Sequence, residues 1–380
     1  MSEHGQGRAD DLLAGVGSDD RRDGPDISGT PRRVRGPRGR SGRGRRVLVV
    51  VAIVVALLGV GGVAAVQVLQ SRLDSNVERL GDPFAGLEGR PTPEGAETQP
   101  SEGPMNILVL GSDSRISAGD PSQWEAGAQR TDAIMLVHLP ADHDGAYVMS
   151  IPRDSWVDIP GHGQAKINAA FSLGGPSLMI QTVEQLTGVR IDHVAVTDFE
   201  SFERITDVLG GVRMTLAEDL VHNGEVLVPA GEQQLLTGEQ ALTYVRQRKN
   251  LARGDFDRVQ RQQAWVRAIF ARMRNEQTLQ NPAESYPFLD AVTQSVALDD
   301  GFTTAVRNDV LARVRDLGST DIGFFTVPIQ GTGTSDDGQS IVVLAQPAFD
   351  ELMDAVAADT VDEYLAANPD VVDTLPAVAP

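Results

Sequence analysis

The stretch 244–263, YVRQRKNLARGDFDRVQRQQ, carries five arginines and one lysine in a chain whose formal net charge is −20. Arginine binds phosphate through two parallel N–H donors, and the first turn of a helix adds the positive end of its dipole. Arginines gathered at a helix start therefore indicate a phosphate site. The alternative is an ion-paired, solvated surface helix, which such charge patterns also favour.

A capping box is predicted just before this stretch. Thr237, with Gln240 three residues later, predicts a helix that ends near Arg246 and Arg248. The two arginines would then leave the helix together at its C-terminal end.

A second helix start is predicted inside the stretch, where Asp257 is followed three residues later by Gln260. On the helix after it, Arg258 and Gln262 fall at the edge of the apolar face, and Arg261 turns further away. The arginines of the first helix, Arg258 and Gln262 can therefore converge around one loop.

Charged residues also flank predicted strands. Buried strands are predicted at 106–111, 133–139 and 146–151. The charged residues at their ends include Asp113, Arg115, Arg130, Asp132 and Arg153. Open α/β sheets place their ligands at strand ends, so a ligand site is predicted here.

Two aspartates beside several arginines suit a Mg²⁺ ion that bridges an anionic substrate, since Mg²⁺ favours one or two carboxylates plus phosphate oxygens and water. Phosphoryl transfer needs mainly positioning and charge neutralisation, which Mg²⁺ and arginine supply. Taken alone, Asp113 and Asp132 are also typical of turns or helix caps. Lys166 and Asn168 could add donors, or could simply begin a helix. The chain has no G-x-S-x-G elbow and no P-loop, so acyl transfer and ATP have little support.

Composition bounds the fold and the partners. The 380 residues allow about two domains, or one large domain with tails. The absence of cysteine excludes disulfides and thiolate metal sites, and the acidic balance argues against nucleic acid as a partner.

The chain before residue 105 predicts a membrane anchor. Residues 1–46 are predicted to be a disordered cytoplasmic tail that ends in eight arginines between 32 and 46. The uncharged run 47–69 is long enough to span a bilayer as one helix, and the arginines before it keep the N-terminus cytoplasmic. Residues 70–104 are expected to be an extracellular linker, followed by a domain at 105–345 and a short acidic tail at 346–380, with one helix and then disorder.

Five ordered motifs resemble those of the LytR–CpsA–Psr family. They are NILVLGSDSR, RTD before a strand, SIPRDS, KINAAFSLGG and the YVRxR…GDxxRxxRQQ block, and they cover about 105–275. The resemblance implies an α/β fold, an α/β/α sandwich with a central mixed sheet, preceded here by the transmembrane helix. It also implies a long apolar groove for an isoprenoid.

The activity implied by the resemblance is that of a Mg²⁺-dependent phosphotransferase on the outer face of the cell membrane. Such enzymes move a glycopolymer, wall teichoic acid for example, from a polyprenyl-pyrophosphate carrier onto the muramic acid 6-hydroxyl of peptidoglycan. One alternative is a pyrophosphatase that releases the glycan to water. Another is a non-catalytic lipid-binding module or transcription-attenuator-type regulator of the envelope.

The same motifs imply residue roles. Asp113 and Asp132 would hold the metal. Pyrophosphate would be bound or supported by Arg115, Arg130, Arg153, Arg246, Arg248, Arg258 and Gln262. The further substrate-binding candidates are Lys166, Asn168, Asp255, which would orient an arginine, and Arg261. Groove-lining or ordinary core residues would be Leu178, Ile180, Val183, Phe199, Phe202, Trp265 and Ile269.

Overall fold

The structure is a computed structural model of the chain, and it describes residues 67–92, 103–112, 131–247, 251–275, 281–318 and 320–380. Within these ranges, no helix combines the length and apolar character needed to cross a bilayer. The predicted membrane helix at 47–69 lies outside them except for its last three residues, which are helical, as are residues 70–76. The predicted cytoplasmic tail, 1–46, also lies outside the described residues.

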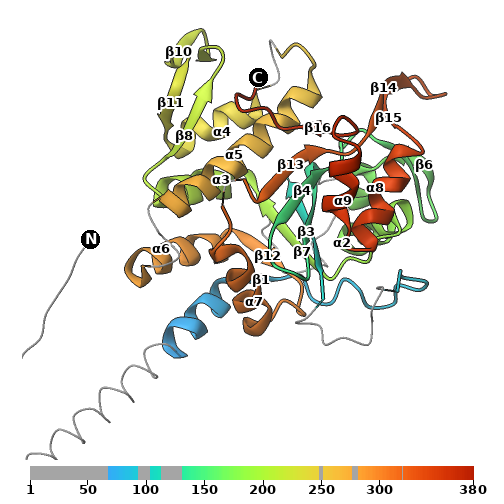
Figure 1. Ribbon diagram of the computed structural model, residues 1–380, viewed down its shortest axis with the longest axis horizontal. Helices are drawn as coiled ribbons and strands as arrows, with labels where there is room; N and C mark the ends of the chain where they lie inside the picture. The colour runs from blue at the N-terminus through green and yellow to red at the C-terminus, as the bar shows by residue number, and fades with distance from the viewer. Residues whose placement is uncertain (1–66, 93–102, 113–130, 248–250, 276–280, 319) are drawn as a thin grey trace, which may run out of the picture. The chain divides into compact units, whose positions relative to one another are not determined.

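A mixed eight-stranded sheet forms the centre of the domain (Figure 1). Its order is β1 (Glu78–Arg79), β12 (Val296–Leu298), β7 (His193–Asp198), β2 (Met105–Ser112), β3 (Thr131–Leu139), β4 (Ala146–Ser150), β13 (Ile322–Thr326) and β16 (Asp373–Thr374). The pairs β7–β2 and β4–β13 are parallel, whereas β3 is antiparallel to both of its neighbours. The predicted α/β class with a central mixed sheet is confirmed.

One edge of this sheet collects several strand ends. Strands β7, β2, β4 and β13 run in one direction, and β3 runs against them. The C-terminal ends of those four strands therefore lie beside the start of β3. Asp132 is the second residue of β3, and Arg153 follows the end of β4, so the topology brings both to this edge.

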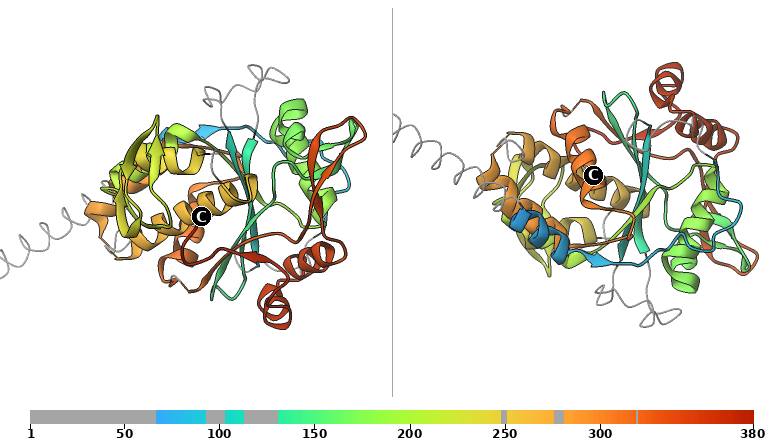
Figure 2. Two further views of the ribbon diagram at one scale, coloured as in Figure 1. Left: turned by 90° about the horizontal axis from the view of Figure 1, so that it is seen from above. Right: turned by 90° about the horizontal axis from the view of Figure 1, so that it is seen from below.

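Helices cover both faces of the sheet and make three layers (Figure 2). One face carries α3 (Phe199–Val208), α4 (Gly238–Arg246), α5 (Asp255–Asn275), α6 (Pro282–Thr293) and α7 (Thr304–Arg315). The other carries α2 (Asn168–Thr187), α8 (Ala348–Ala357) and α9 (Val361–Ala367).

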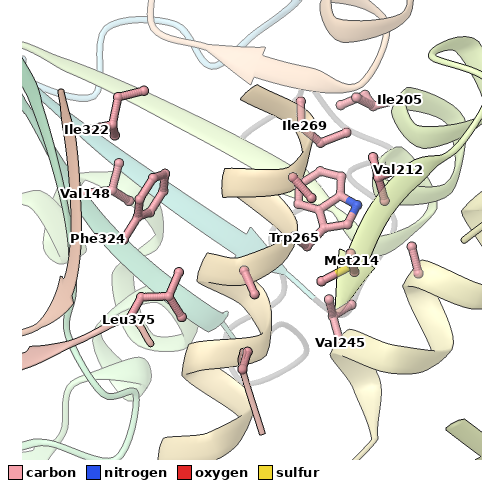
Figure 3. Close-up of a cluster of buried hydrophobic side chains, with 14 of the residues drawn as sticks. Val148, Ile205, Val212, Met214, Val245, Trp265, Ile269, Ile322, Phe324 and Leu375 are labelled. Atoms are coloured by element: carbon pink, nitrogen blue, oxygen red, sulfur yellow. The ribbon is translucent and has the colours of Figure 1, made fainter. Parts of the chain in front are cut away.

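The two faces bury separate cores, because successive side chains of a strand point to opposite sides. On β2, Ile107 belongs to the core under α5 and Leu108 to the core under α2. Trp265 of α5 lies in the first core (Figure 3). Its indole N–H donates to Thr206 Oγ1 at 2.9 Å. Helix α5 is thus held against the sheet by a large apolar surface.

Four two-stranded antiparallel sheets complete the described part of the fold, and the sequence patterns did not predict them. They are β5 (Trp156–Ile159) with β6 (Gly163–Lys166), β8 (Val212–Leu216) with β11 (Gly231–Leu236), β9 (Leu220–His222) with β10 (Glu225–Val228), and β14 (Ile329–Thr334) with β15 (Ser340–Leu344). The β5–β6 hairpin matters for the site, because Lys166 ends it immediately before α2.

The two segments expected to flank the domain differ from the prediction. Within the expected linker, β1 pairs with β12 and Leu80 is 7% exposed. The expected acidic tail forms α8, α9 and β16, and its Phe349 is fully buried. Apolar residues spaced between the acidic ones reach the core, so the expectation of disorder after one helix is wrong.

Candidate active site

Helix α5 begins at Asp255, two residues before the predicted cap. Asp257 therefore lies in the first turn, where its carboxylate accepts from the backbone N–H and the Nε of Arg253, at 2.8 and 2.7 Å. The predicted capping box of α4 is confirmed, with Thr237 and Gln240 bonded reciprocally. The two predicted helices thus frame the 247–254 connection, of which 248–250 lie outside the described residues.

Two arginines and two aspartates meet at the sheet edge. Arg153 Nη1 donates to Asp132 Oδ1, and its Nη2 lies 3.5 Å from Asp255 Oδ1. Arg258 Nη2 lies 2.6 Å from the same Asp255 oxygen, and its Nη1 lies 3.9 Å from Asp132 Oδ1. Each arginine therefore contacts both carboxylates, and the four residues form a closed Arg–Asp cluster.

The Arg–Asp cluster is largely removed from water. The side chain of Arg258 is 2% exposed and that of Asp132 is 8% exposed, whereas Arg153 and Asp255 reach 17% and 26%. Burial acts to lower the pKa of Arg153, but Asp255, Asp132 and Asp154 together raise it above its ordinary value. The guanidinium of Arg153 is thus held as a cation in an environment that strengthens electrostatic interactions.

A second ion pair extends the cluster. Asp154 Oδ2 lies 3.8 Å from Arg153 Nε, and its Oδ1 lies 3.2 Å from Lys166 Nζ. The backbone N–H of Asn168 donates to the carbonyl of Arg153 at 3.2 Å. The predicted candidates Lys166 and Asn168 therefore lie beside Arg153. Asp154 belongs to the charged cluster that follows the predicted strand 146–151, but the sequence analysis gave it no role in the site.

Two neighbouring glutamines of α5 are buried about one turn after Arg258 along the helix. Gln262 is 1% exposed and Gln263 is fully buried. Gln263 Nε2 donates to Ser150 Oγ and to the carbonyl of Phe325, both at 2.8 Å. Gln263 therefore ties α5 to the ends of β4 and β13, a role that the sequence patterns did not indicate.

Of the remaining candidates, two arginines are described and four residues are not. Arg246 is exposed and ends α4. The guanidinium of Arg261 contacts Tyr244, Gln247 and Pro380 instead of the Arg–Asp cluster. The other predicted site residues lie outside the described residues: Asp113, Arg115, Arg130 and Arg248.

The proposed groove-lining residues do not share one surface. Ile180 and Val183 are fully buried in the core under α2, while Trp265 and Ile269 lie in the core under α5, on the opposite face of the sheet. The side chains of Phe199 and Phe202 are not described. For these four residues the core interpretation is correct, and together they do not form a single groove.

Comparison with known proteins identifies the family of this chain. A LytR_cpsA_psr family profile matches residues 86–358. "Cell wall biosynthesis protein LcpA" of Corynebacterium glutamicum is 32% identical over 283 residues, which are 64% of this chain and 54% of LcpA. This chain therefore spans about half the length of that curated relative.

Solved structures share the fold. TagT bound to LI-WTA is 26% identical with a TM-score of 0.56, over 69% of this chain and 93% of TagT. YwtF (TagT) with bound octaprenyl pyrophosphate lipid is 24% identical with a TM-score of 0.52, over 69% of this chain and 92% of that one, and this likeness concerns the fold alone.

The domain is thus an α/β/α sandwich with charged residues gathered at one edge of a mixed sheet. The family profile covers most of it, and the chain belongs to the LytR–CpsA–Psr family.

Proposed function

We propose that this chain is a membrane-anchored, Mg²⁺-dependent phosphotransferase of cell wall assembly. It moves a glycopolymer from a polyprenyl-pyrophosphate carrier onto the muramic acid 6-hydroxyl of peptidoglycan and forms a phosphodiester. The observation that carries the proposal is the convergence of Arg153 and Arg258 with Asp132 and Asp255 at one sheet edge. Family membership, the cell wall role in the name of LcpA and the LI-WTA bound to TagT support it.

The proposed topology is a single pass through the cell membrane, with the N-terminus cytoplasmic and the domain outside. The eight arginines before the apolar run 47–69 support this orientation. A lipid-linked donor would then meet the domain at the outer face of the membrane, beside the peptidoglycan acceptor.

The arginines are suited to hold the phosphate oxygens of the donor. A guanidinium binds phosphate bidentately, and donors already oriented by carboxylates need little reorganisation when charge develops during reaction. Asp132 and Asp255 each contact both arginines, so the two carboxylates hold both guanidinium groups in place. In the proposed step, the acceptor hydroxyl attacks the glycan-bearing phosphorus. The bond to the bridging oxygen breaks, polyprenyl phosphate leaves, and the proton of the hydroxyl is released to water.

The charge balance of the described site supports a role for further cations. Arg153, Arg258 and Lys166 are matched by Asp132, Asp154 and Asp255, so the six side chains sum to zero. A diphosphate adds negative charge. In our proposal Mg²⁺ and the arginines at positions 115, 130, 246 and 248 balance it.

The residue types fit Mg²⁺. The described residues hold no group of three or more metal-binding side chains, but Mg²⁺ needs only one or two carboxylates when phosphate and water complete its shell. Asp132 would hold the ion together with Asp113. When bound, Mg²⁺ would neutralise charge on the transferred phosphoryl group.

The test is reconstitution with a lipid-pyrophosphate-linked glycan, peptidoglycan and Mg²⁺. We expect transfer by the wild type, and a loss of about a hundredfold or more in Arg153→Ala, because a preorganised donor is removed. Arg190→Ala is the matched control, since Arg190 donates to the carbonyl of Pro91 outside the site. Equal transfer by Arg153→Ala and wild type would contradict the site. Glycan phosphate released to water regardless of peptidoglycan would indicate the pyrophosphatase alternative.

A further inference from the structure

Arg261 is a buried arginine of α5 that turns away from the Arg–Asp cluster. It is 7% exposed, and its guanidinium lies 4.5 Å from the centre of the Tyr244 ring. Its Nη1 donates to the Tyr244 carbonyl at 3.4 Å and to Gln247 Oε1 at 2.6 Å. Its Nε donates to the carbonyl of Pro380 at 2.5 Å. One side chain thus joins α5, the end of α4 and the segment 373–380.

Arg261, a residue of α5, caps the C-terminal end of α4 through its contact with Tyr244. Helix α4 ends at Arg246, so the carbonyl of Tyr244 belongs to the last turn, where carbonyls lack partners within the helix. An arginine side chain can satisfy such carbonyls and also suits the negative end of the helix dipole. Gln247, the second partner, is the C-cap residue of the same helix. Arg261 therefore fixes the C-terminal end of α4 at Gln247, the residue after Arg246.

The segment 373–380 is fixed by the sheet at its start. Strand β16 pairs with β13, and the N–H of Leu375 donates to the carbonyl of Phe324 at 2.9 Å. The side chain of Asp373 accepts from Arg253 and Gln260, each at 3.1 Å. The segment is thus attached to both the sheet and the start of α5.

The rest of the segment lies along α5 and reaches α4. Arg267 donates to the carbonyls of Pro376 and Ala377, both at 2.9 Å, and Ala379 is 3% exposed. The Tyr244 hydroxyl donates to the Pro380 carbonyl at 3.3 Å. The last residues therefore complete the hydrogen bonding of Arg261 and Tyr244 together.

The buried side chain of Arg261 donates to oxygen atoms of Tyr244, Gln247 and Pro380. Burial lowers the pKa of Arg261, and it likewise lowers that of Arg267. A buried cation is stable only when its donors are satisfied, so loss of one acceptor is costly. This dependence makes the orientation of Arg261 sensitive to the segment 373–380.

We propose that Arg261 is a positioning residue that, with the segment 373–380, holds the end of α4 at a fixed place beside the start of α5. In this arrangement the segment sets the position of Arg246 relative to Arg258. The inference deepens the proposed function, on which its consequence for pyrophosphate binding rests, and it replaces the prediction that Arg261 itself binds substrate.

The experiment uses two variants. Arg261→Lys keeps the positive charge but loses the planar guanidinium, and a chain shortened to end at Val378 lacks Pro380, the acceptor for Arg261. The control is Arg272→Lys, because Arg272 of α5 donates to the carbonyl of Leu209 at the end of α3 in the same manner. The first measurement is hydrogen exchange, without ligand, at the Gln247 amide, which donates to Thr243 in the last turn of α4. The second is binding of farnesyl pyrophosphate with Mg²⁺.

We expect Arg261→Lys and the shortened chain to raise exchange at Gln247 about tenfold and to weaken farnesyl pyrophosphate binding about tenfold, with Arg272→Lys changing neither. Wild-type exchange in both variants, or an equal rise in Arg272→Lys, would overturn the positioning role. An effect in Arg261→Lys but not in the shortened chain would overturn the part assigned to the segment. If the wild type binds no pyrophosphate, the proposed function fails, while the exchange measurement still decides whether Arg261 positions α4.

Discussion

The pair Arg258–Asp255 offers the sharpest test of the Arg–Asp cluster. Arg258 is 2% exposed, and its Nη2 lies 2.6 Å from Asp255 Oδ1. Removing one partner of a buried ion pair costs about 3–5 kcal/mol, because the other charge stays buried without compensation. Arg258→Met should come near the lower end of that range, since Asp132 and Asp255 both keep Arg153 as a partner.

The double mutant Arg258→Met with Asp255→Asn should recover part of that loss. Asp255 is 26% exposed, and solvent therefore screens the pair, so we expect a coupling free energy of about 1–3 kcal/mol. The measurement is the free energy of unfolding in urea for the wild type, both single variants and the double variant. Arg190→Met is the control, because Arg190 donates to the backbone carbonyl of Pro91, outside the Arg–Asp cluster. Additive effects of the two substitutions, with a coupling near zero, would refute the description of the four residues as one electrostatic unit.

Three further predictions follow from the site and its supports. Gln263→Leu should lower the free energy of unfolding by about 2–3 kcal/mol and reduce glycan transfer, because Ser150 Oγ and the Phe325 carbonyl lose their buried donor. Thermal unfolding at the wild-type temperature would contradict this prediction. Asp154→Asn should weaken binding of farnesyl pyrophosphate severalfold with little effect on stability, because Asp154 lies between Arg153 and Lys166 and is partly solvated; affinity equal to that of wild type would remove it from the site. Burial raises the pKa of Tyr244 to about 12 from 10.0, so its contribution to stability is complete below pH 10.0 and is lost as pH rises toward about 12. In Tyr244→Phe, the free energy of unfolding should fall less steeply with pH in this window. An unchanged slope would contradict the assignment of the pH dependence to Tyr244.

The sequence by itself predicted three central strands, one helix cap and the residues of the Arg–Asp cluster. Hydrophobic runs with polar ends placed β2, β3 and β4 within about two residues of their observed bounds. Thr237 and Gln240 marked the start of α4, because a capping box is satisfied within four residues. The motifs also named Asp132, Arg153, Asp255 and Arg258, which the fold brings together.

Only the tertiary structure decided how these residues are supported. Gln263 bonds Ser150 and Phe325, and Arg261 bonds Pro380 119 positions away, so neither role leaves a local pattern. The residues after 345 resemble a solvated tail in sequence. In the fold they are ordered because β16 pairs with β13 and because Phe349 and Leu375 are buried. Local propensity and periodicity report contacts within a few residues. The free energy that orders these parts comes from burial and hydrogen bonds between segments that meet only after folding.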